Sequence, residues 1–215
     1  APNDLKKYAA LNEKLKGIYM PYWTYDSKAK TNYEGERGEH YYEGSGKNRV
    51  RKTRWYDANG TVQNSFDDVC VLASQSLPDS VTRPLEPWDL NNLTPYNEGY
   101  ISGFQTECYQ TDVQKGFDMA KDVMEDAIKV TIRQQIGGDE QRINRMHVVY
   151  SNVTFKHILL PVWISAYGYN SKIFRFIING RTGEVQGQRP YSAIKIALAV
   201  IAVIALIVLI KTIAE

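Results

Sequence analysis

The feature that most constrains this chain is an apolar run near its C-terminal end. Fifteen consecutive residues from Ile196 to Ile210 are all Ala, Val, Ile or Leu, and Lys195 and Lys211 bracket them. Fifteen helical residues span about 22 Å, which is shorter than the roughly 30 Å hydrocarbon core of a bilayer. A helix over 193–214 is longer, and its two lysines can reach opposite headgroup layers. The run therefore predicts a transmembrane helix over 193–214 in contact with lipid, with a buried core helix as the alternative.

The charges on either side of this run predict its orientation. Lys211 is the only cation after the run. The segment before it carries five cations and one acid, namely Lys172, Arg175, Arg181, Glu184, Arg189 and Lys195. Cytoplasmic flanks of membrane helices carry an excess of Lys and Arg. We therefore expect a single-pass protein with its soluble body in the cytoplasm and its C-terminus across the membrane.

The net charge limits the kinds of partner. The chain holds 26 basic and 24 acidic residues, which gives a net charge of +2. This balance indicates neither a nucleic-acid-binding surface nor an acidic tail. Residues 1–190 are enough for one medium-sized domain or two small ones.

Two helices are expected in the body of the chain. The first begins at Asn3 or Asp4, has apolar residues at helical spacing and ends at Gly17. The second covers 112–136 and ends at a pair of glycines, as a helix C-terminus often does. Short alternating runs rich in aromatic residues follow each helix, and they are typical of antiparallel strands.

This pattern predicts an α+β fold made of two helix-plus-antiparallel-meander units and one transmembrane helix. The first unit covers 1–75, and the second covers 111–190. The segment 76–110 between them is rich in proline and is expected to connect the units, with a short helix and little other regular structure. The anchor over 193–214 completes the chain.

Two pairs of similar segments favour a duplication. Met20-Pro-Tyr-Trp23 resembles Leu160-Pro-Val-Trp163, and Gly35-Glu-Arg-Gly-Glu39 resembles Gly180-Arg-Thr-Gly-Glu184. The glycines of the second pair are typical of tight turns between strands, because glycine adopts positive φ without steric cost. The alternative is that such segments are common strand starts and turns that occur twice here.

Motifs of catalysis and phosphate binding are not found. The segment Glu43-Gly-Ser-Gly-Lys47 lacks the first glycine and the final Ser or Thr of a phosphate loop, and we interpret it as a hairpin tip. Asp67 and Asp68 are neighbours on an expected strand, where successive side chains point to opposite faces, so they should not share a site. Asp139-Glu140 is expected in a solvated loop.

The histidines and cysteines do not form a metal site in the sequence. His147 and His157 have no ligand spacing and no activated Ser or Cys beside them, so we expect structural roles for both. Cys70 and Cys108 are expected to be buried free thiols, with a single disulfide as the alternative. We therefore expect no catalytic residue, no metal and no cofactor.

The first strand-rich region combines aromatic and basic side chains. The residues expected to form an interaction surface there are Tyr22, Tyr25, Tyr33, Arg51, Arg54 and Trp55. Three explanations stay open for this composition. The aromatic rings could pair across strands in a half-buried sheet, dock onto a partner or headgroups, or stack with the bases of a single-stranded nucleic acid.

Several segments together resemble a known family of bacterial proteins. They are Ala1-Pro-Asn-Asp-Leu-Lys-Lys-Tyr8, Tyr19-Met-Pro-Tyr-Trp-Thr-Tyr25, Tyr33-Glu-Gly-Glu-Arg-Gly38, Lys52-Thr-Arg-Trp55, Phe66-Asp-Asp-Val69, Ile136-Gly-Gly-Asp-Glu-Gln141, Val153-Thr-Phe-Lys-His-Ile-Leu-Leu-Pro-Val-Trp163 and Arg189-Pro-Tyr-Ser192. With them the chain resembles the bacterial zinc-ribbon-associated membrane proteins that are often labelled primosomal protein N′-like. Members of that family carry Cys-x-x-Cys zinc ribbons ahead of the Ala-Pro-Asn segment, and this sequence has none. The resemblance thus implies the membrane-proximal region of such a protein, located at the bacterial inner membrane.

These observations lead to one functional expectation and one alternative. We expect a non-enzymatic, membrane-anchored accessory or scaffolding subunit of a larger bacterial membrane complex, with other membrane proteins as partners. The alternative is a nucleic-acid-binding module tethered to the membrane, although nucleic acid is the less expected partner. The sequence names neither the partner complex nor the process.

Overall fold

A computed structural model describes residues 15–44, 49–77 and 79–214 of the chain, without the side chains of 79, 80, 193 and 208–214. The contacts divide the chain into two compact units. Unit 2 consists of Met20–Ser76 and Thr106–Leu160, and unit 1 consists of Ala1–Tyr19, Leu77–Gln105 and Pro161–Glu215. Each unit therefore combines segments that are far apart in the sequence. The helix expected from Asn3 or Asp4 lies almost entirely outside the described residues.

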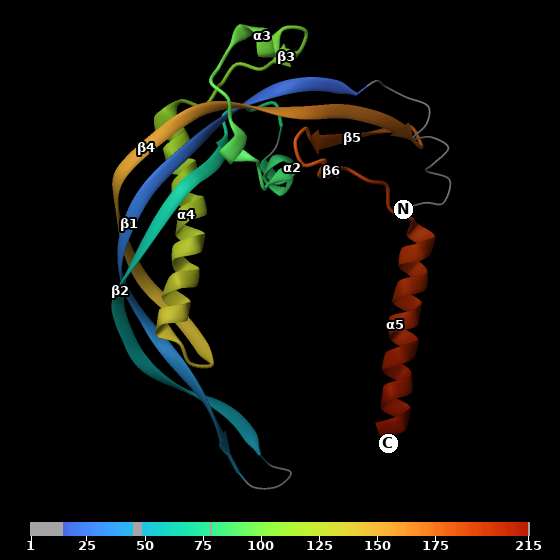
Figure 1. Ribbon diagram of the computed structural model, residues 1–215. Coiled ribbons are helices and arrows are strands. Elements are labelled where there is room, and N and C mark those ends of the chain that lie inside the picture. The colour runs from blue at the N-terminus through green and yellow to red at the C-terminus, as the bar shows by residue number, and fades with distance from the viewer. Residues whose placement is uncertain (1–14, 45–48, 78, 215) are drawn as a thin grey trace. The chain divides into compact units, whose positions relative to one another are not determined.

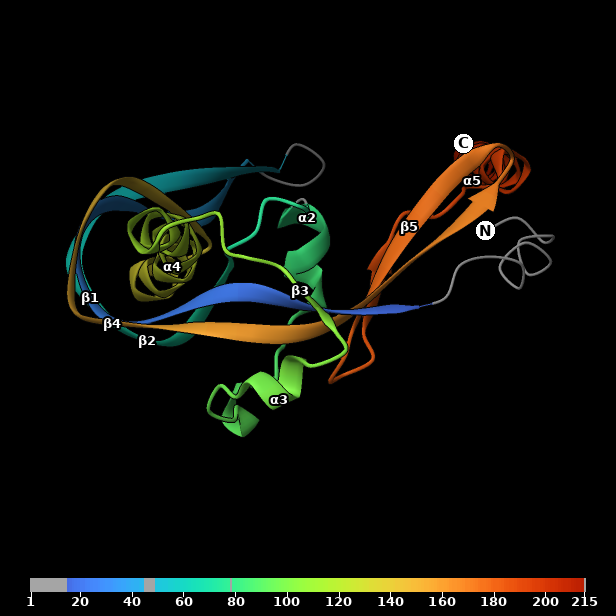
Figure 2. The ribbon, with the colours of Figure 1, turned by 90° about the horizontal axis from the view of Figure 1, so that it is seen from above.

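Unit 2 is an antiparallel sheet that curves around one long helix. Strand β1 (Lys16–Glu43) pairs with β2 (Val50–Leu72) from Tyr22 opposite Leu72 to Glu43 opposite Val50. Strand β4 (Glu140–Tyr169) lies on the other side of β1, in the order β2-β1-β4. Figures 1 and 2 show helix α4 (Val113–Ile136) on the concave side of these three strands.

Helix α4 has clear start and stop signals. The Asp112 carboxylate accepts a hydrogen bond from the Lys115 backbone N–H at 2.9 Å and so caps the first turn. Gly137 follows the last turn with φ of 66°, and its N–H donates to the carbonyl of Arg133. The helix expected over 112–136 is thereby confirmed.

One stripe of α4 faces the sheet. Its buried residues recur every four positions, and they are Gly116, Ala120, Met124, Ile128, Ile132 and Ile136. Residues four apart lie on the same face of a helix. The sheet covers this stripe in two clusters, one around Trp23 and Tyr25 and the other around Ala29, Tyr33 and Val62.

Two side chains of β1 hold the start of α4. The Trp23 Nε1 donates to the carbonyl of Thr111 at 2.8 Å, and the Tyr25 hydroxyl donates to the carbonyl of Val113 at 2.6 Å. Gly116 leaves room for both rings, because an added Cβ would lie 2.9 Å from Trp23 Cδ1. The aromatic residues thus fix the helix to the strand as well as filling the core.

The first strand-rich region is one long hairpin instead of a meander of short strands. Strand β1 has 28 residues and β2 has 23. The turn expected at Gly35–Glu39 lies inside β1, where Gly35 pairs with Ala58. A Cβ on Gly35 would collide with the carbonyl oxygen of Arg142. The glycine is therefore needed because β4 packs closely against β1 at this position, and not because the chain turns there. The predicted pair of helix-plus-meander units, and the duplication with it, is therefore wrong.

Unit 1 contains a smaller sheet and several short helices. Strand β5 (Lys172–Asn179) pairs with the last part of β4 and with β6 (Val185–Gly187). The segment Leu77–Gln105 of this unit contains four short helices. They are α2 (Asp79–Thr82), the 3-10 helices η2 (Arg83–Leu85) and η3 (Leu90–Asn92), and α3 (Glu98–Ile101). A two-residue strand, β3 (Gln105–Thr106), pairs with β1. The region 76–110 thus has more regular structure than expected, all of it in short pieces.

The turn between β5 and β6 depends on one buried amide. Asn179 is 1% exposed, and its side-chain oxygen accepts hydrogen bonds from the N–H groups of Arg181 and Thr182. Its side-chain nitrogen donates to the carbonyl of Leu85 at 2.9 Å. Gly183 has φ of 76°, as a tight turn requires. The second of the two predicted glycine turns, Gly180–Glu184, is therefore a real turn.

Helix α5 (Ala193–Ala214) contains the apolar run. Among the described residues, no helix combines the length and the apolar character needed to cross a membrane. The predicted transmembrane anchor, with Ile196 and Ile210 at its ends, is therefore wrong. The inner-membrane, single-pass localisation that followed from it is wrong as well.

Substitution of Ile132 tests the packing of α4. Ile132 is fully buried, so Ile132→Ala should lower the free energy of unfolding by about 2–5 kcal/mol through lost burial and a cavity. Val130 is 50% exposed on the same helix, and Val130→Ala should change the stability by less than about 0.5 kcal/mol. Urea unfolding followed by circular dichroism measures both. Equal effects of the two substitutions would contradict the placement of α4.

Candidate functional site

The aromatic residues expected at an interaction surface lie in the interior. Tyr22 is 3% exposed, Tyr25 1% and Tyr33 5%. Tyr25 and Tyr33 face α4, where Tyr25 lies against Phe117 and Tyr33 belongs to the cluster with Ile132. Burial raises the pKa of Tyr25 to about 12, with smaller contributions from nearby carboxylates. These rings therefore stabilise the fold and are not available to a partner.

The other three expected surface residues do not share one face. Arg54 pairs with Glu39, and the next residue, Trp55, pairs with Gly38, so their side chains point to opposite faces of the hairpin. The Arg142 guanidinium lies 3.7 Å above the Trp55 ring. Arg51 lies on the same face as Trp55 and is exposed. Together with the buried tyrosines, the six residues do not form a single exposed surface.

Three carboxylates meet on the face of the sheet that points away from α4. Oxygen atoms of Asp26, Asp67 and Asp68 lie within 4.8 Å of one another. The expectation that Asp67 and Asp68 point apart is wrong, because the register shifts between Tyr25 and Ser27 and Asp68 has φ of 52°. Two residues of β2 therefore lie opposite one residue of β1, which is a β-bulge.

Asp26 connects both neighbouring strands at this point. One oxygen accepts the Asp68 backbone N–H at 2.8 Å, and the other accepts the Thr154 hydroxyl of β4 at 2.8 Å. Asn152, two residues before Thr154, also has φ of 52°. The Lys156 ammonium lies 2.6 Å from Asp68 and 3.9 Å from Asp26. The cluster thus contains its own cation.

The pKa shifts agree with this pairing. The hydrogen bond from the Asp68 N–H lowers the pKa of Asp26, and Thr154 and Lys156 add to that effect against partial desolvation. The hydrogen bond with Asp68 raises the pKa of Lys156. Carboxylate oxygens are the ligands that hard cations prefer. Here the Lys156 ammonium already lies beside the carboxylates of Asp26 and Asp68. The arrangement fits a structural ion-pair network that holds the bulge.

The histidines also have structural neighbours. His40 Nε2 lies 2.7 Å from a Glu140 carboxylate oxygen that also accepts the Thr53 hydroxyl, and the hydrogen bond with His40 lowers the pKa of Glu140. Glu140 therefore joins β4 to the hairpin instead of lying in a free loop. The His157 ring lies 4.7 Å from the Trp23 ring, and burial lowers its pKa. Cys70 is half-buried and Cys108 is exposed, and no disulfide joins the two, so the expectation that both thiols are buried is wrong.

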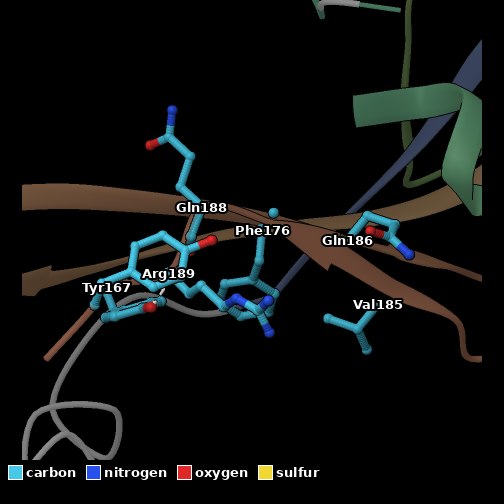
Figure 3. A pocket seen from close by; sticks show the side chains of 8 residues that line it. Tyr167, Phe176, Val185, Gln186, Gln188 and Arg189 are labelled. Atoms are coloured by element: carbon cyan, nitrogen blue, oxygen red, sulfur yellow. Dashed lines mark hydrogen bonds between the residues drawn. The ribbon is translucent and has the colours of Figure 1, made fainter. Parts of the chain in front are cut away.

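A pocket of about 740 Å³ lies in unit 1 on the face of the sheet formed by β4, β5 and β6. Its lining includes Tyr167, Phe176, Gln186, Gly187, Gln188 and Arg189. Figure 3 shows Tyr167, Phe176 and Arg189 close together, with Val185 and Gln186 at the other end. The pocket thus combines an apolar floor with amide groups and one guanidinium.

Hydrogen bonds and ring contacts shape this pocket. The Tyr167 hydroxyl donates to the carbonyl of Gln188 at 3.4 Å, and burial raises the pKa of this tyrosine. The Tyr167 ring is stacked on Phe174 at 5.5 Å and lies 6.1 Å from Phe176. None of these residues is among the site residues expected from the sequence. The signal that could have found them is the pair Phe174 and Phe176, two positions apart in β5 and therefore on one face.

Comparison with known proteins gives one relative and no function. The chain is 27% identical over 185 residues to "Uncharacterized protein YdjG" of Bacillus subtilis (strain 168). The alignment covers 85% of this chain and 54% of that protein, so the chain spans about half the length of this relative. No protein-family model matches the chain, and no solved structure matches it.

Substitution of Asp26 tests the carboxylate cluster. Asp26→Asn should lower the free energy of unfolding by about 1.5–3 kcal/mol at neutral pH, because hydrogen bonds to a charged acceptor are lost. The folded-state pKa of Asp26 lies below the ordinary 3.8, so its stabilisation is complete above that value and is lost as the pH falls through the folded-state pKa. The stability difference between wild type and variant should therefore shrink below about pH 4. Denaturant unfolding between pH 2.5 and 7 measures it.

A matched control is the exposed Asp126, which pairs with Lys129 at 3.3 Å on the surface of α4. Asp126→Asn should cost less than about 0.5 kcal/mol at any pH. A stability difference for Asp26→Asn that does not depend on pH would show that the carboxylate charge has no role in the bulge.

Proposed function

We propose that the protein is a non-enzymatic accessory or scaffolding subunit of a larger protein assembly, in which apolar helices of partner subunits cover α5. The observation that carries this proposal is the exposure of α5. Its described aliphatic side chains are each more than half exposed, including Ile194 at 74%, Leu198 at 61% and Ile201 at 62%. Exposed apolar patches of this size mark interaction sites.

The exposed side chains lie all around the helix. Ile201 and Val203 are about 200° apart around the helix axis, at 100° per residue, and both are more than half exposed. A helix that is apolar on every face is stable only when it is buried on every face. One partner surface covers one face, so we expect at least two neighbouring helices around α5.

The gain from covering this helix is large. Complete burial of one Leu, Ile or Val side chain contributes about 1.5–3 kcal/mol, and α5 offers nine such exposed side chains among its described residues. Only part of this sum becomes binding energy, because association also costs entropy. Even so, the helix alone can hold a stable complex.

The ionisable clusters support a role without catalysis. Lys156 pairs with Asp68, and His40 with Glu140, and both contacts join strands of the sheet. The hydroxyl groups beside these clusters, those of Thr53 and Thr154, donate to the carboxylates and so join strands as well. The resemblance to zinc-ribbon-associated proteins stays a prediction.

The nucleic-acid alternative receives no support from the arrangement of the basic residues. The guanidinium of Arg49 lies 4.0 Å above the Tyr42 ring, and that of Arg54 lies 4.9 Å from the Tyr41 ring. These contacts occupy ring faces that bases would need for stacking.

Charged substitutions in α5 test the proposal. The full-length protein should elute as an oligomer or as a stoichiometric complex with a partner at micromolar concentration. The double variant Leu198→Glu with Val203→Glu should elute with the mass of one chain, because carboxylates cannot be buried unpaired in an apolar interface. Size-exclusion chromatography with light scattering measures the mass.

The matched control changes two exposed aliphatic residues outside α5, Val149→Glu and Ile173→Glu, which are 54% and 69% exposed in the wild type. This control should keep the assembled mass, and circular dichroism should show that both double variants are folded. Wild-type protein that is monomeric without detergent and free of a stoichiometric partner would disprove the proposal.

A further inference from the structure

We infer that the pocket beside β6 binds an extended acidic peptide, which adds as a strand to the free edge of β6 and places a carboxylate on Arg189. This inference does not depend on α5 or on the proposed function. It rests on three properties of the site: an open strand edge, a single cation and an aromatic floor.

Strand β6 forms one edge of the described sheet, and the short segments α2 and η2 also contact it. Strand β6 pairs with β5 and is the last strand in the order of the described sheet. The backbone N–H of Gln188 donates to the carbonyl of Arg175, and the backbone N–H of Asn179 donates to the carbonyl of Glu184. Both hydrogen bonds join β5 to the segment that contains β6. In antiparallel pairs, hydrogen-bonded positions alternate with positions whose N–H and C=O groups point away.

This alternation assigns the free groups. Gln186 lies two residues from each of the bonded positions, Glu184 and Gln188, and it pairs with Ile177. Its backbone N–H and C=O groups therefore also point toward β5. The backbone groups of Val185 and Gly187 therefore point away from β5, toward the open edge. Val185 is 54% exposed, and Gly187 is exposed as well. Unpaired groups of this kind are a template for an added strand.

Gly187 keeps the strand in this position. A Cβ on Gly187 would lie 2.6 Å from Phe176 Cα, closer than real Cβ contacts allow. The bonds of Asn179 fix the preceding turn. The strand edge is thus preorganised, which lowers the entropy cost of binding.

The side chains of the pocket select for negative charge. Arg189 is the one charged side chain in the lining, and it also lies 5.6 Å from the Tyr191 ring. The exposed Lys172 lies two residues before Phe174 in β5 and so on the pocket's face of the sheet, where a second cation favours an anion. Guanidinium groups bind carboxylates with two parallel hydrogen bonds.

The remaining lining suits a peptide better than a small anion. Tyr167 and Phe176 supply an apolar floor for one side chain of an added strand. The Gln186 amide nitrogen already donates to the Glu184 carboxylate at 2.9 Å, so Arg189 is the group left for an anion. Five consecutive residues, from Val185 to Arg189, line the pocket, so it extends along the strand. A small anion would use Arg189 and leave the rest of this surface empty.

Peptide binding to the full-length protein tests the inference. The probe is a fluorescein-labelled peptide of nine residues with alternating Val and Glu, and its fluorescence anisotropy is measured as protein is added. We expect saturable binding that weakens as salt is raised. The same peptide with Lys in place of Glu should not bind.

Two further probes separate strand addition from simple charge attraction. The acidic peptide is N-methylated either at every Val or at every Glu, which removes alternate N–H donors. One of the two forms should lose binding, because only alternate N–H groups of an added strand face the edge. Equal binding of both forms and of the unmethylated peptide would overturn strand addition, as would binding of free acetate with the same affinity.

Variants of two arginines identify the anchoring cation. Arg189→Gln should weaken binding roughly tenfold, as expected for a lost charge-assisted hydrogen bond. Arg175 pairs with Ala166, next to Tyr167, so its side chain points to the opposite face of the sheet from the pocket. The matched control Arg175→Gln should change the affinity less than twofold. Equal losses in the two variants, or no saturable binding to wild type, would overturn the inference.

Discussion

The bend of the sheet at Asp26 is the constraint on which unit 2 depends. Helix α4 buries every fourth residue from Gly116 to Ile136, and at 100° per residue each step turns this stripe by about 40° around the helix, so strands without bend or twist could not follow it. At Asp26 both neighbouring strands carry a residue with φ of 52°, Asp68 and Asn152. Bulges bend strands and increase their twist. The sheet can then follow the helix from Ala120 to Ile136.

The carboxylate of Asp26 holds this bend from the outer face. It accepts one hydrogen bond from β2 and one from β4, and Lys156 offsets part of the negative charge of the three carboxylates. The two core clusters lie on either side of this point, with Tyr25 in one and Ala29 in the other. A polar network on one face of the sheet therefore determines how the apolar face packs.

The sequence predicted the helix better than the strands. A cap at Asp112 and two glycines after Ile136 mark α4 locally, so its ends could be found without tertiary information. The long hairpin could not, because Gly35 looks like a turn residue and only the approach of β4 explains it. The pairing of Asp67 with Asp68 was missed for a similar reason, since a bulge reverses the strand alternation.

The interaction surface predicted from the sequence included three tyrosines that are buried, because the alternation of side chains along a strand was not applied to the aromatic residues. Tyr25, Ala29 and Tyr33 all occupy odd positions of β1, and this spacing places them on one face with the helix. The pocket beside β6 was not predictable in the same way, since its residues come from three strands and the segment that follows them. The exposure of α5 was likewise visible only once the rest of the fold was known.

The buried amide of Asn179 also has a chemical consequence. Asparagine followed by glycine cyclises readily in flexible chains, because the glycine nitrogen attacks the side-chain amide and releases ammonia. Here the Gly180 nitrogen donates to the carbonyl of Pro161 at 2.8 Å, and the Asn179 side chain is held by three hydrogen bonds. The fold therefore protects this pair from deamidation. In a chain that stays unfolded, water would open the resulting succinimide to aspartate or isoaspartate at position 179. The ionised carboxylate of either product could not donate to Leu85, so each such event would make refolding of the turn harder.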